Sequence, residues 1–122
     1  MQYLLLIYSD EKMDASMSKA EQDAWMGEWF AYTEELRNSG VSTAGEALHP
    51  TSTATTLRSK DGKVITTHGP FAETKEQLGG YYVLNCKDLD EAISWVSKCP
   101  GVRTGSLELR PIVDFSQGTG AA

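Results

Sequence analysis

Hydrophobic residues open the chain in an unbroken run from Tyr3 to Tyr8, without the alternation expected of a strand that has one face in solvent. A strand with this pattern is apolar on both faces, so both faces need cover. The sequence therefore predicts a central strand over residues 3–8. The apolar segment is far too short to span a bilayer, and it lacks the basic flank and the cleavage region of a secretory signal.

A polar stretch, residues 10–17, separates this strand from a long amphipathic helix. Ser18 and Glu21 have the spacing of a capping box, which predicts that the helix begins there, and Gly40 supplies a left-handed stop. Residues at helical spacing form a broad, mostly aromatic stripe on one side of it. They are Trp25, Met26, Trp29, Phe30, Tyr32, Thr33 and Leu36.

Short strands follow the helix. The Gly and Pro residues in 44–50 predict an extended segment, and the Thr-rich residues 53–58 predict a strand. Lys60-Asp61-Gly62 is a hairpin signal that leads into a second strand over 63–67. Residues 81–86 are predicted to form a further strand.

A second capping pair, Asp88 and Glu91, predicts a short helix that Pro100 and Gly101 close. The apolar side of this helix consists of Leu89, Ala92, Ile93 and Val96. The last predicted strand covers 107–113, and its proline indicates an edge or the end of ladder pairing.

This order of elements predicts an α+β, ferredoxin-like βαββαβ fold with an added extended segment, in which two helices cover one face of an antiparallel sheet. We expect a single domain over residues 1–115 and a disordered tail over 116–122. The sheet face without helices would expose apolar side chains of the first strand. A two-fold homodimer that packs sheet against sheet would cover them.

The stretch THGPFAETKEQLGGYYVL, residues 67–84, holds more polar side chains than a connecting turn needs. Its paired glycines, Gly79 and Gly80, predict a bulge or a close backbone approach at the start of a strand. The segment resembles the signature of the DGPF family, a YCII-related group. The match runs from Gly69 to Gly80, with His68 where the family has aspartate. The resemblance implies membership of the dimeric α/β-barrel group.

Charge and composition limit the classes of partner that we expect. The net charge is −6 and the eleven Lys and Arg residues are scattered, so we expect no nucleic-acid partner and no membrane partner. Cys86 and Cys99 lack ligand-like spacing, which indicates a reduced, cytoplasmic protein. His49 and His68 lie on different segments and match no metal motif, so neither a metal nor a cofactor is predicted.

The signature segment supplies most candidate ligand-binding residues. His68 is either an acid, base or ligand near neutral pH or a turn histidine with local hydrogen bonds. Glu73 and Lys75 either bind a polar ligand or belong to a solvated turn. Phe71 is a further candidate, although its expected structural role is to pin the loop onto the core.

Two aromatic residues of the long helix, Trp29 and Tyr32, are candidates for contact with a planar ligand, and the alternative is that they pack in the core. Some YCII-related proteins are proposed to use a His and Asp pair. The resemblance places those positions at Trp29 and Cys99 in this chain, so that dyad is not expected.

Three functions remain open at this stage. The leading hypothesis is a small dimeric protein that binds a small molecule between sheet and helices near the HGPFAETKE loop. An enzyme of lyase, isomerase or cofactor-free oxygenase type is one alternative, by analogy of fold. The other, which the resemblance implies, is an interaction module linked to an extracytoplasmic function sigma factor.

Overall fold

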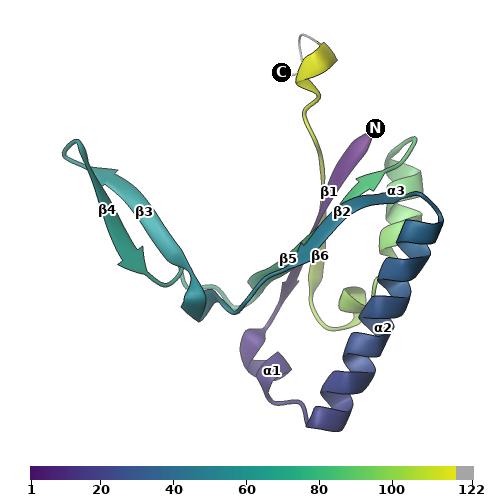
Figure 1. Ribbon diagram of the computed structural model, residues 1–122, viewed down its shortest axis with the longest axis horizontal. Coiled ribbons are helices and arrows are strands. Elements are labelled where there is room, and N and C mark those ends of the chain that lie inside the picture. Colours follow the sequence, from purple (N-terminus) through teal and green to yellow (C-terminus); the bar gives the residue numbers. More distant parts are fainter. Residues whose placement is uncertain (118–122) are drawn as a thin grey trace.

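The structure is a computed structural model and describes residues 1–117. Four antiparallel strands form its main sheet in the order β2-β5-β1-β6 (Figure 1). The bounds are β1 Gln2–Ser9, β2 Ser42–Ala47, β5 Gln77–Asn85 and β6 Ser106–Pro111. Because β1 pairs with both β5 and β6, the prediction of a central first strand is confirmed. The strand order is that of a ferredoxin-like fold.

Helices α2 (Lys19–Asn38) and α3 (Leu89–Val96) cover one face of the sheet (Figure 1). Both predicted N-caps are confirmed. The Ser18 backbone amide donates to Glu21 Oε1 at 3.0 Å, the Glu21 amide donates to Ser18 Oγ at 3.2 Å, and Asp88 accepts from the amide three residues later. These bonds satisfy amides that the first helical turn leaves without partners.

A third, short helix was not predicted. Helix α1 (Glu11–Ala15) lies within the polar stretch, where Asp10 caps it by accepting from the amide of Lys12 at 2.9 Å. A helix of five residues is too short to show an apolar period, so only its cap could have indicated it.

The middle of the chain pairs differently from the prediction. The extended segment near residue 45 is itself a strand of the sheet, β2, whereas the two Thr-rich strands, β3 (Thr55–Lys60) and β4 (Lys63–His68), form a separate hairpin. The hairpin signal is confirmed, because Asp61 and Gly62 have φ of 52° and 78°, as a two-residue turn requires. β-propensity marks a strand but not its partner, which depends on burial against distant segments.

The core lies between the sheet and helices α2 and α3. Its buried side chains come from β1, β5, the two helices and the segments that connect them. They are Tyr3, Leu5, Tyr32, Leu36, Val41, Leu84, Cys86, Ala92 and Cys99.

The opposite side of the sheet carries a second apolar surface, which we call the open face. It is formed by the partly buried side chains of Leu4, Leu6, Tyr8, Leu78, Tyr81 and Val83. Cross-strand pairing places them together, since Leu4 lies opposite Val83, Leu6 opposite Tyr81 and Tyr8 opposite Leu78. Within residues 1–117, both long helices lie on the other side of the sheet (Figure 1).

Both predicted roles of the glycine pair are confirmed. Pairing with β1 steps from Gly80 to Leu78, so Gly79 is the extra residue of a bulge. A Cβ on Gly80 would lie 2.9 Å from the backbone oxygen of Glu46, which shows how closely β2 approaches.

The end of the chain is described only in part. Ser116 lies in the 3-10 helix η3 (Phe115–Gln117) and donates from its amide to Asp114 Oδ1 at 3.0 Å. The other residues of the predicted tail, 118–122, lie outside the described residues. Within residues 1–117 no helix is both long and apolar enough to cross a membrane.

Candidate functional site

The second half of the signature segment anchors the loop to the sheet. The side-chain amide of Gln77 donates to the carbonyl of Thr74, while its Oε1 accepts from the amide of Glu11 at 2.9 Å. Glu76 Oε1 accepts from the hydroxyl of Ser106, at the start of β6, at 2.7 Å. Together with the glycine pair, these contacts give residues 76–80 a structural role.

The first half of the segment is tied down through its backbone. Gly69 has a φ of +94°, and its amide donates to the carbonyl of Ala54 at 2.7 Å while its carbonyl accepts from the hydroxyl of Thr56 at 2.8 Å. A left-handed residue that closes the base of a hairpin favours glycine. The Phe71 carbonyl accepts from Arg58 at 3.5 Å.

Four loop side chains remain outside these contacts, and all four were predicted as site residues. His68, Phe71, Glu73 and Lys75 are exposed, and among residues 1–117 their side chains make no hydrogen bond, ion pair or ring contact. The expectation that phenylalanine pins the loop onto the core is wrong, because Phe71 is 75% exposed. Polar backbone bonds, rather than apolar burial, hold this loop in place.

The two helical candidates lie in a different environment. Trp29 and Tyr32 belong to a chain of edge-to-face rings that runs from Trp25 on α2 to Tyr82 on β5, with centroids 5.8–6.4 Å apart. Tyr32 is buried, and its hydroxyl donates to the Trp95 carbonyl at 3.0 Å. Tyr32 therefore packs in the core, whereas Trp25 and Trp29 are only partly buried.

The titratable groups of this core are held in their neutral forms. Burial raises the pKa of Tyr32 above its usual range, with smaller contributions from neighbouring ionisable groups. Burial also raises the pKa of Tyr82, against the lowering effect of its hydrogen bond with Thr33. Burial likewise raises the pKa of Cys99 to about 11. Its thiol therefore stays protonated at neutral pH and is a poor nucleophile.

The raised pKa of Cys99 predicts base lability. The folded thiol holds its proton to a higher pH than an ordinary thiol with a pKa of 9.0, so its contribution is fully present below pH 9 and lost as the pH rises towards 11. We expect the free energy of unfolding to fall across this window by on the order of 2 kcal/mol from this group. Denaturant titrations at several pH values measure the fall. The free energy of unfolding of Cys99→Ala should depend less steeply on pH than that of the wild type. Identical slopes would contradict the assignment.

Two shallow hollows lie on the helical side of the molecule. The first, about 380 Å³, runs between α2 and residues 97–103, and its rim carries the ion pairs Lys98–Glu35 and Arg103–Glu28 at 3.2 and 2.6 Å. Tyr32 is the only sequence-predicted site residue that lines it. Within residues 1–117 no hydrogen bond or ring contact joins Tyr32 or Trp29 to the four loop residues, and neither hollow is lined by any of those four.

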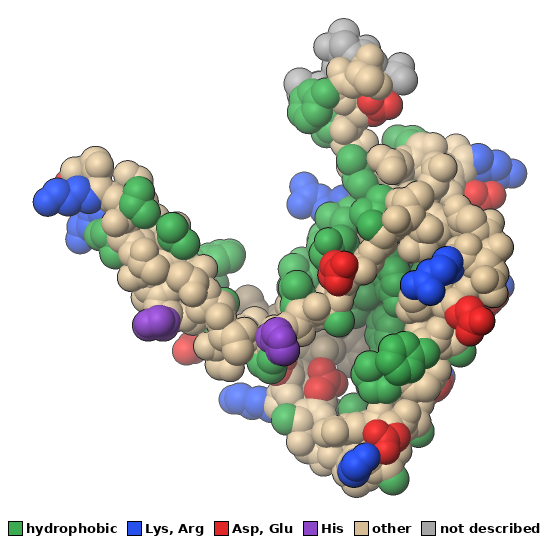
Figure 2. Space-filling model, in the orientation of Figure 1, with side chains coloured by type: hydrophobic (Ala, Val, Ile, Leu, Met, Phe, Trp, Pro, Cys, Tyr) green, Lys and Arg blue, Asp and Glu red, His purple; other side chains and the backbone are tan. Residues whose placement is uncertain are grey.

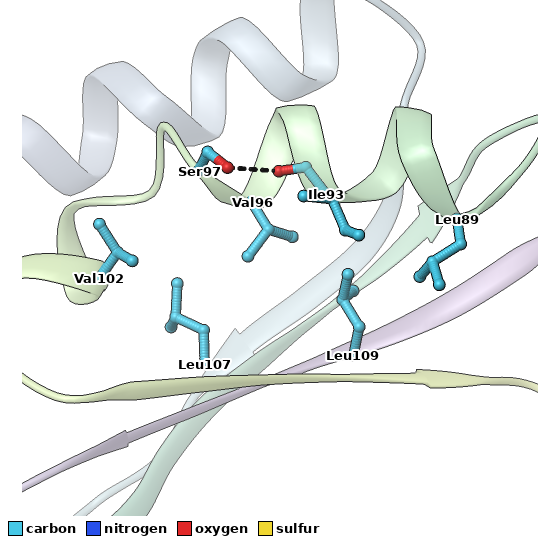
Figure 3. Close-up of a pocket in the computed structure, with 7 residues that line it drawn as sticks. All are labelled: Leu89, Ile93, Val96, Ser97, Val102, Leu107 and Leu109. Carbon is cyan, nitrogen blue, oxygen red and sulfur yellow. Dashed lines mark hydrogen bonds between the residues drawn. The ribbon is translucent and has the colours of Figure 1, made fainter.

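The second hollow is an apolar groove of about 320 Å³ between α3 and β6 (Figure 3). Side chains of α3 point across it towards the leucines of β6, and the hydroxyl of Ser97 donates to the Ile93 carbonyl at 2.7 Å. Its lining residues are Leu89, Ile93, Val96, Ser97, Val102, Leu107 and Leu109. Sequence reasoning missed this groove. The available signal was an apolar stripe on α3 too wide for the core to cover: Ala92 is fully buried, but Leu89 and Ile93 are about half exposed.

The described residues offer neither a metal site nor the family dyad. Among residues 1–117, no group of three or more His, Cys, Asp or Glu side chains is placed to hold a metal ion. At the positions of the proposed family dyad, Trp29 is a partly buried ring beside Gly101, and Cys99 is buried and protonated.

Comparisons with known proteins identify a family for this chain. A family model described as the YCII-related domain matches residues 1–116. An uncharacterised protein of Rhizobium meliloti is 38% identical over 120 residues, which cover 97% of each chain. Among solved structures, the chain resembles 5-chloro-2-hydroxyhydroquinone dehydrochlorinase of Burkholderia phenoliruptrix in complex with 2,5-dihydroxybenzoquinone. The TM-score is 0.48 and the identity 13%, with 92% of this chain and 93% of that chain covered. A likeness at this level carries no inference about activity.

Proposed function

Because this chain belongs to the YCII-related domain family, we propose that it is a homodimeric protein that binds a small molecule, with the HGPFAETKE loop, residues 68–76, at the rim of the site. One observation carries the proposal. Gly69, Glu76 and Gln77 anchor the loop, whereas the side chains of His68, Phe71, Glu73 and Lys75 have no partner among residues 1–117. A base or acid, an aromatic ring and a pair of opposite charges on a well-anchored loop suit a polar ligand with an apolar part.

The proposed ligand lies between the sheet and the helices, with the loop at its edge. The aromatic chain along α2 supports this placement, because Trp25 and Trp29 keep part of their ring surface accessible while Tyr32 and Tyr82 are tied into the core. Partly exposed rings offer planar contact area at little cost in conformational entropy.

The open face supports the proposed homodimer. Its six apolar side chains lie on the two central strands, β1 and β5, and are only partly buried in the single chain. Contiguous apolar surface of this kind marks an interface. A second copy packed sheet to sheet gives the arrangement of the dimeric α/β-barrel group that the signature resembles.

Removing the charges of the loop should weaken binding without unfolding the protein. Lys75→Ala and Glu73→Ala are each expected to lower the affinity for a ligand found by screening about 10-fold, because one charge-assisted hydrogen bond contributes about 1.5 kcal/mol. The unfolding midpoint should stay close to wild type, since both side chains are exposed and unpaired. Native mass spectrometry of a metabolite library, followed by calorimetry, provides the affinities.

Matched controls separate the site from general charge effects. Lys87→Ala and Glu34→Ala make the same charge changes at exposed positions away from the loop and should leave affinity unchanged. His68→Asp restores the family residue and should alter which library members bind. Equal affinity in the loop variants and in the controls would reject the loop as part of the site.

A second candidate, an interaction module for an extracytoplasmic function sigma factor, is favoured by the apolar groove between α3 and β6. Leu89, Ile93 and Val102 are 50%, 48% and 51% exposed there, away from the open face. Exposed apolar surface in addition to a dimer interface suits a protein partner. The enzyme alternative lacks comparable support within residues 1–117, because the groups with raised pKa, Tyr32, Tyr82, Cys86 and Cys99, keep their protons at neutral pH.

The cellular compartment belongs to the same proposal. Both cysteines are free and buried, which is typical of a protein that stays in a reducing cytoplasm.

A further inference from the structure

The β3–β4 hairpin has two faces of different chemistry. Pairing of Leu57 with Thr66 and of Ser59 with Val64 puts those side chains on one side, because partners across the ladder share a face. This neutral face comprises Thr55, Leu57, Ser59, Val64, Thr66 and His68. The opposite, basic face comprises Thr56, Arg58, Lys60, Lys63, Ile65 and Thr67.

Within residues 1–117, side chains of the basic face form hydrogen bonds to the rest of the chain, and side chains of the neutral face form none. Thr56 and Arg58 donate to the carbonyls of Gly69 and Phe71, which fixes the base of the hairpin to the signature loop. Leu57 and Val64, on the neutral face, are 61% and 70% exposed. A two-stranded hairpin is only marginally stable in water by itself, so an ordered hairpin with exposed apolar residues needs another surface to cover it.

The position of the hairpin indicates where that surface comes from. The hairpin projects on the side of the sheet that the helices leave uncovered (Figure 1), and the space-filling view shows an open notch between the hairpin and the body of the protein (Figure 2). Hydrophobic side chains gather along both walls (Figure 2). A body seated on the open face would therefore also meet the hairpin.

The second copy that we propose on the open face is the body that would meet the hairpin, and the charge of the hairpin as a whole is compatible with this partner. Residues 55–68 hold three of the eleven Lys and Arg residues and one of the seventeen Asp and Glu residues, so the hairpin is basic while the chain as a whole carries −6. Two such chains repel each other except where the basic hairpin of one lies beside the acidic body of the other.

We propose that the β3–β4 hairpin is an arm that clasps a second copy of this chain through its neutral face, with Leu57 and Val64 as the main contacts. The inference rests on the homodimer of the proposed function and adds a second contact to it. Because the HGPFAETKE loop continues directly from β4, the clasp also brings residues 68–75 near the boundary between the two copies.

Neighbouring residues on opposite faces provide a matched test. Val64→Glu should raise the dimer dissociation constant about 30-fold, because it puts a charge into an apolar contact. Ile65→Glu makes the same charge change on the basic face and should raise it less than about 3-fold. Sedimentation equilibrium over a range of concentrations measures both constants, and circular dichroism verifies folding. Equal constants for the two variants would overturn the clasp.

Two further measurements keep the result decisive. Benzoylphenylalanine at position 64 should crosslink one copy to another on irradiation, whereas the same group at position 65 should not. Deletion of residues 55–68 joins Ala54 to Gly69. The Gly69 amide already donates to the Ala54 carbonyl at 2.7 Å, so the two ends lie close together. The deletion should weaken the dimer without abolishing it. If the deletion variant dimerises with the affinity of the wild type, the clasp is rejected and the sheet-to-sheet dimer is retained. A monomeric wild type would reject both. Crosslinks only to other proteins would show that the arm serves a different partner.

Discussion

Replacing Gly80 with valine is expected to lower the free energy of unfolding by about 3 kcal/mol, because a side chain there meets backbone rather than flexible atoms. An added Cβ would lie 2.9 Å from the Glu46 oxygen and 3.5 Å from the Ala47 Cα. These atoms belong to β2, which is hydrogen-bonded to β5, so the clash is relieved only if the two strands move apart. The two γ-methyl groups of valine add further crowding at the same place. Equilibrium denaturation in urea measures the change.

The neighbouring glycine provides the control. At Gly79 the nearest atom to an added Cβ is the Ile7 oxygen at 4.0 Å, which is an ordinary contact, and the residue is exposed in the bulge. Gly79→Ala should therefore be neutral, or more stable by about 0.5 kcal/mol through the smaller entropy of the unfolded chain. If Gly79→Ala and Gly80→Val lose the same stability, close approach of β2 is not the reason for the glycine at position 80.

The second large effect is on assembly. Leu6→Asp should weaken the proposed homodimer about 1,000-fold, because two carboxylates, one from each copy, would enter an apolar interface without partners. Leu6 lies on β1 at the centre of the open face, opposite Tyr81 and Glu108 on the flanking strands. In the single chain it is only partly buried and points away from the core, so folding should survive. Light scattering across micromolar concentrations gives the mass.

An equivalent charge on the helical side tests whether the effect is specific. Phe30→Asp changes an apolar residue that is 66% exposed on α2, away from the open face, and should leave the dimer intact. Dissociation by Phe30→Asp but not by Leu6→Asp would move the interface to the helices. It would also remove the surface on which the hairpin arm is proposed to act.

Several features of this molecule could be predicted from short stretches of sequence. The caps at Ser18 and Asp88 rest on hydrogen bonds that span three residues, and the Asp61-Gly62 turn rests on the backbone freedom of its own residues. Such signals require no knowledge of distant segments. The same applies to β1, whose apolar run indicates cover on both faces wherever that cover comes from.

The candidate site was predictable only in part. The signature pointed to the loop residues, and the structure shows which of them anchor the loop and which are free. The sequence did not indicate that Phe71 lies in solvent, or that α3 and β6 form an apolar groove. Both depend on how separate elements of the chain pack, rather than on bonds within a few residues.

The sequence by itself determined where α2 and α3 begin and where the β3–β4 hairpin turns, because caps and tight turns are decided by bonds and torsions within a few residues. Only the tertiary structure decided which strands pair. Ser42–Ala47 entered the sheet, where Gly45 allows the Tyr82 ring to lie against it, and the more strand-like Thr-rich pair was left outside as a hairpin. Sheet membership depends on packing against distant residues, since a strand's partners are selected by the side chains and backbone they must lie beside rather than by its own propensity.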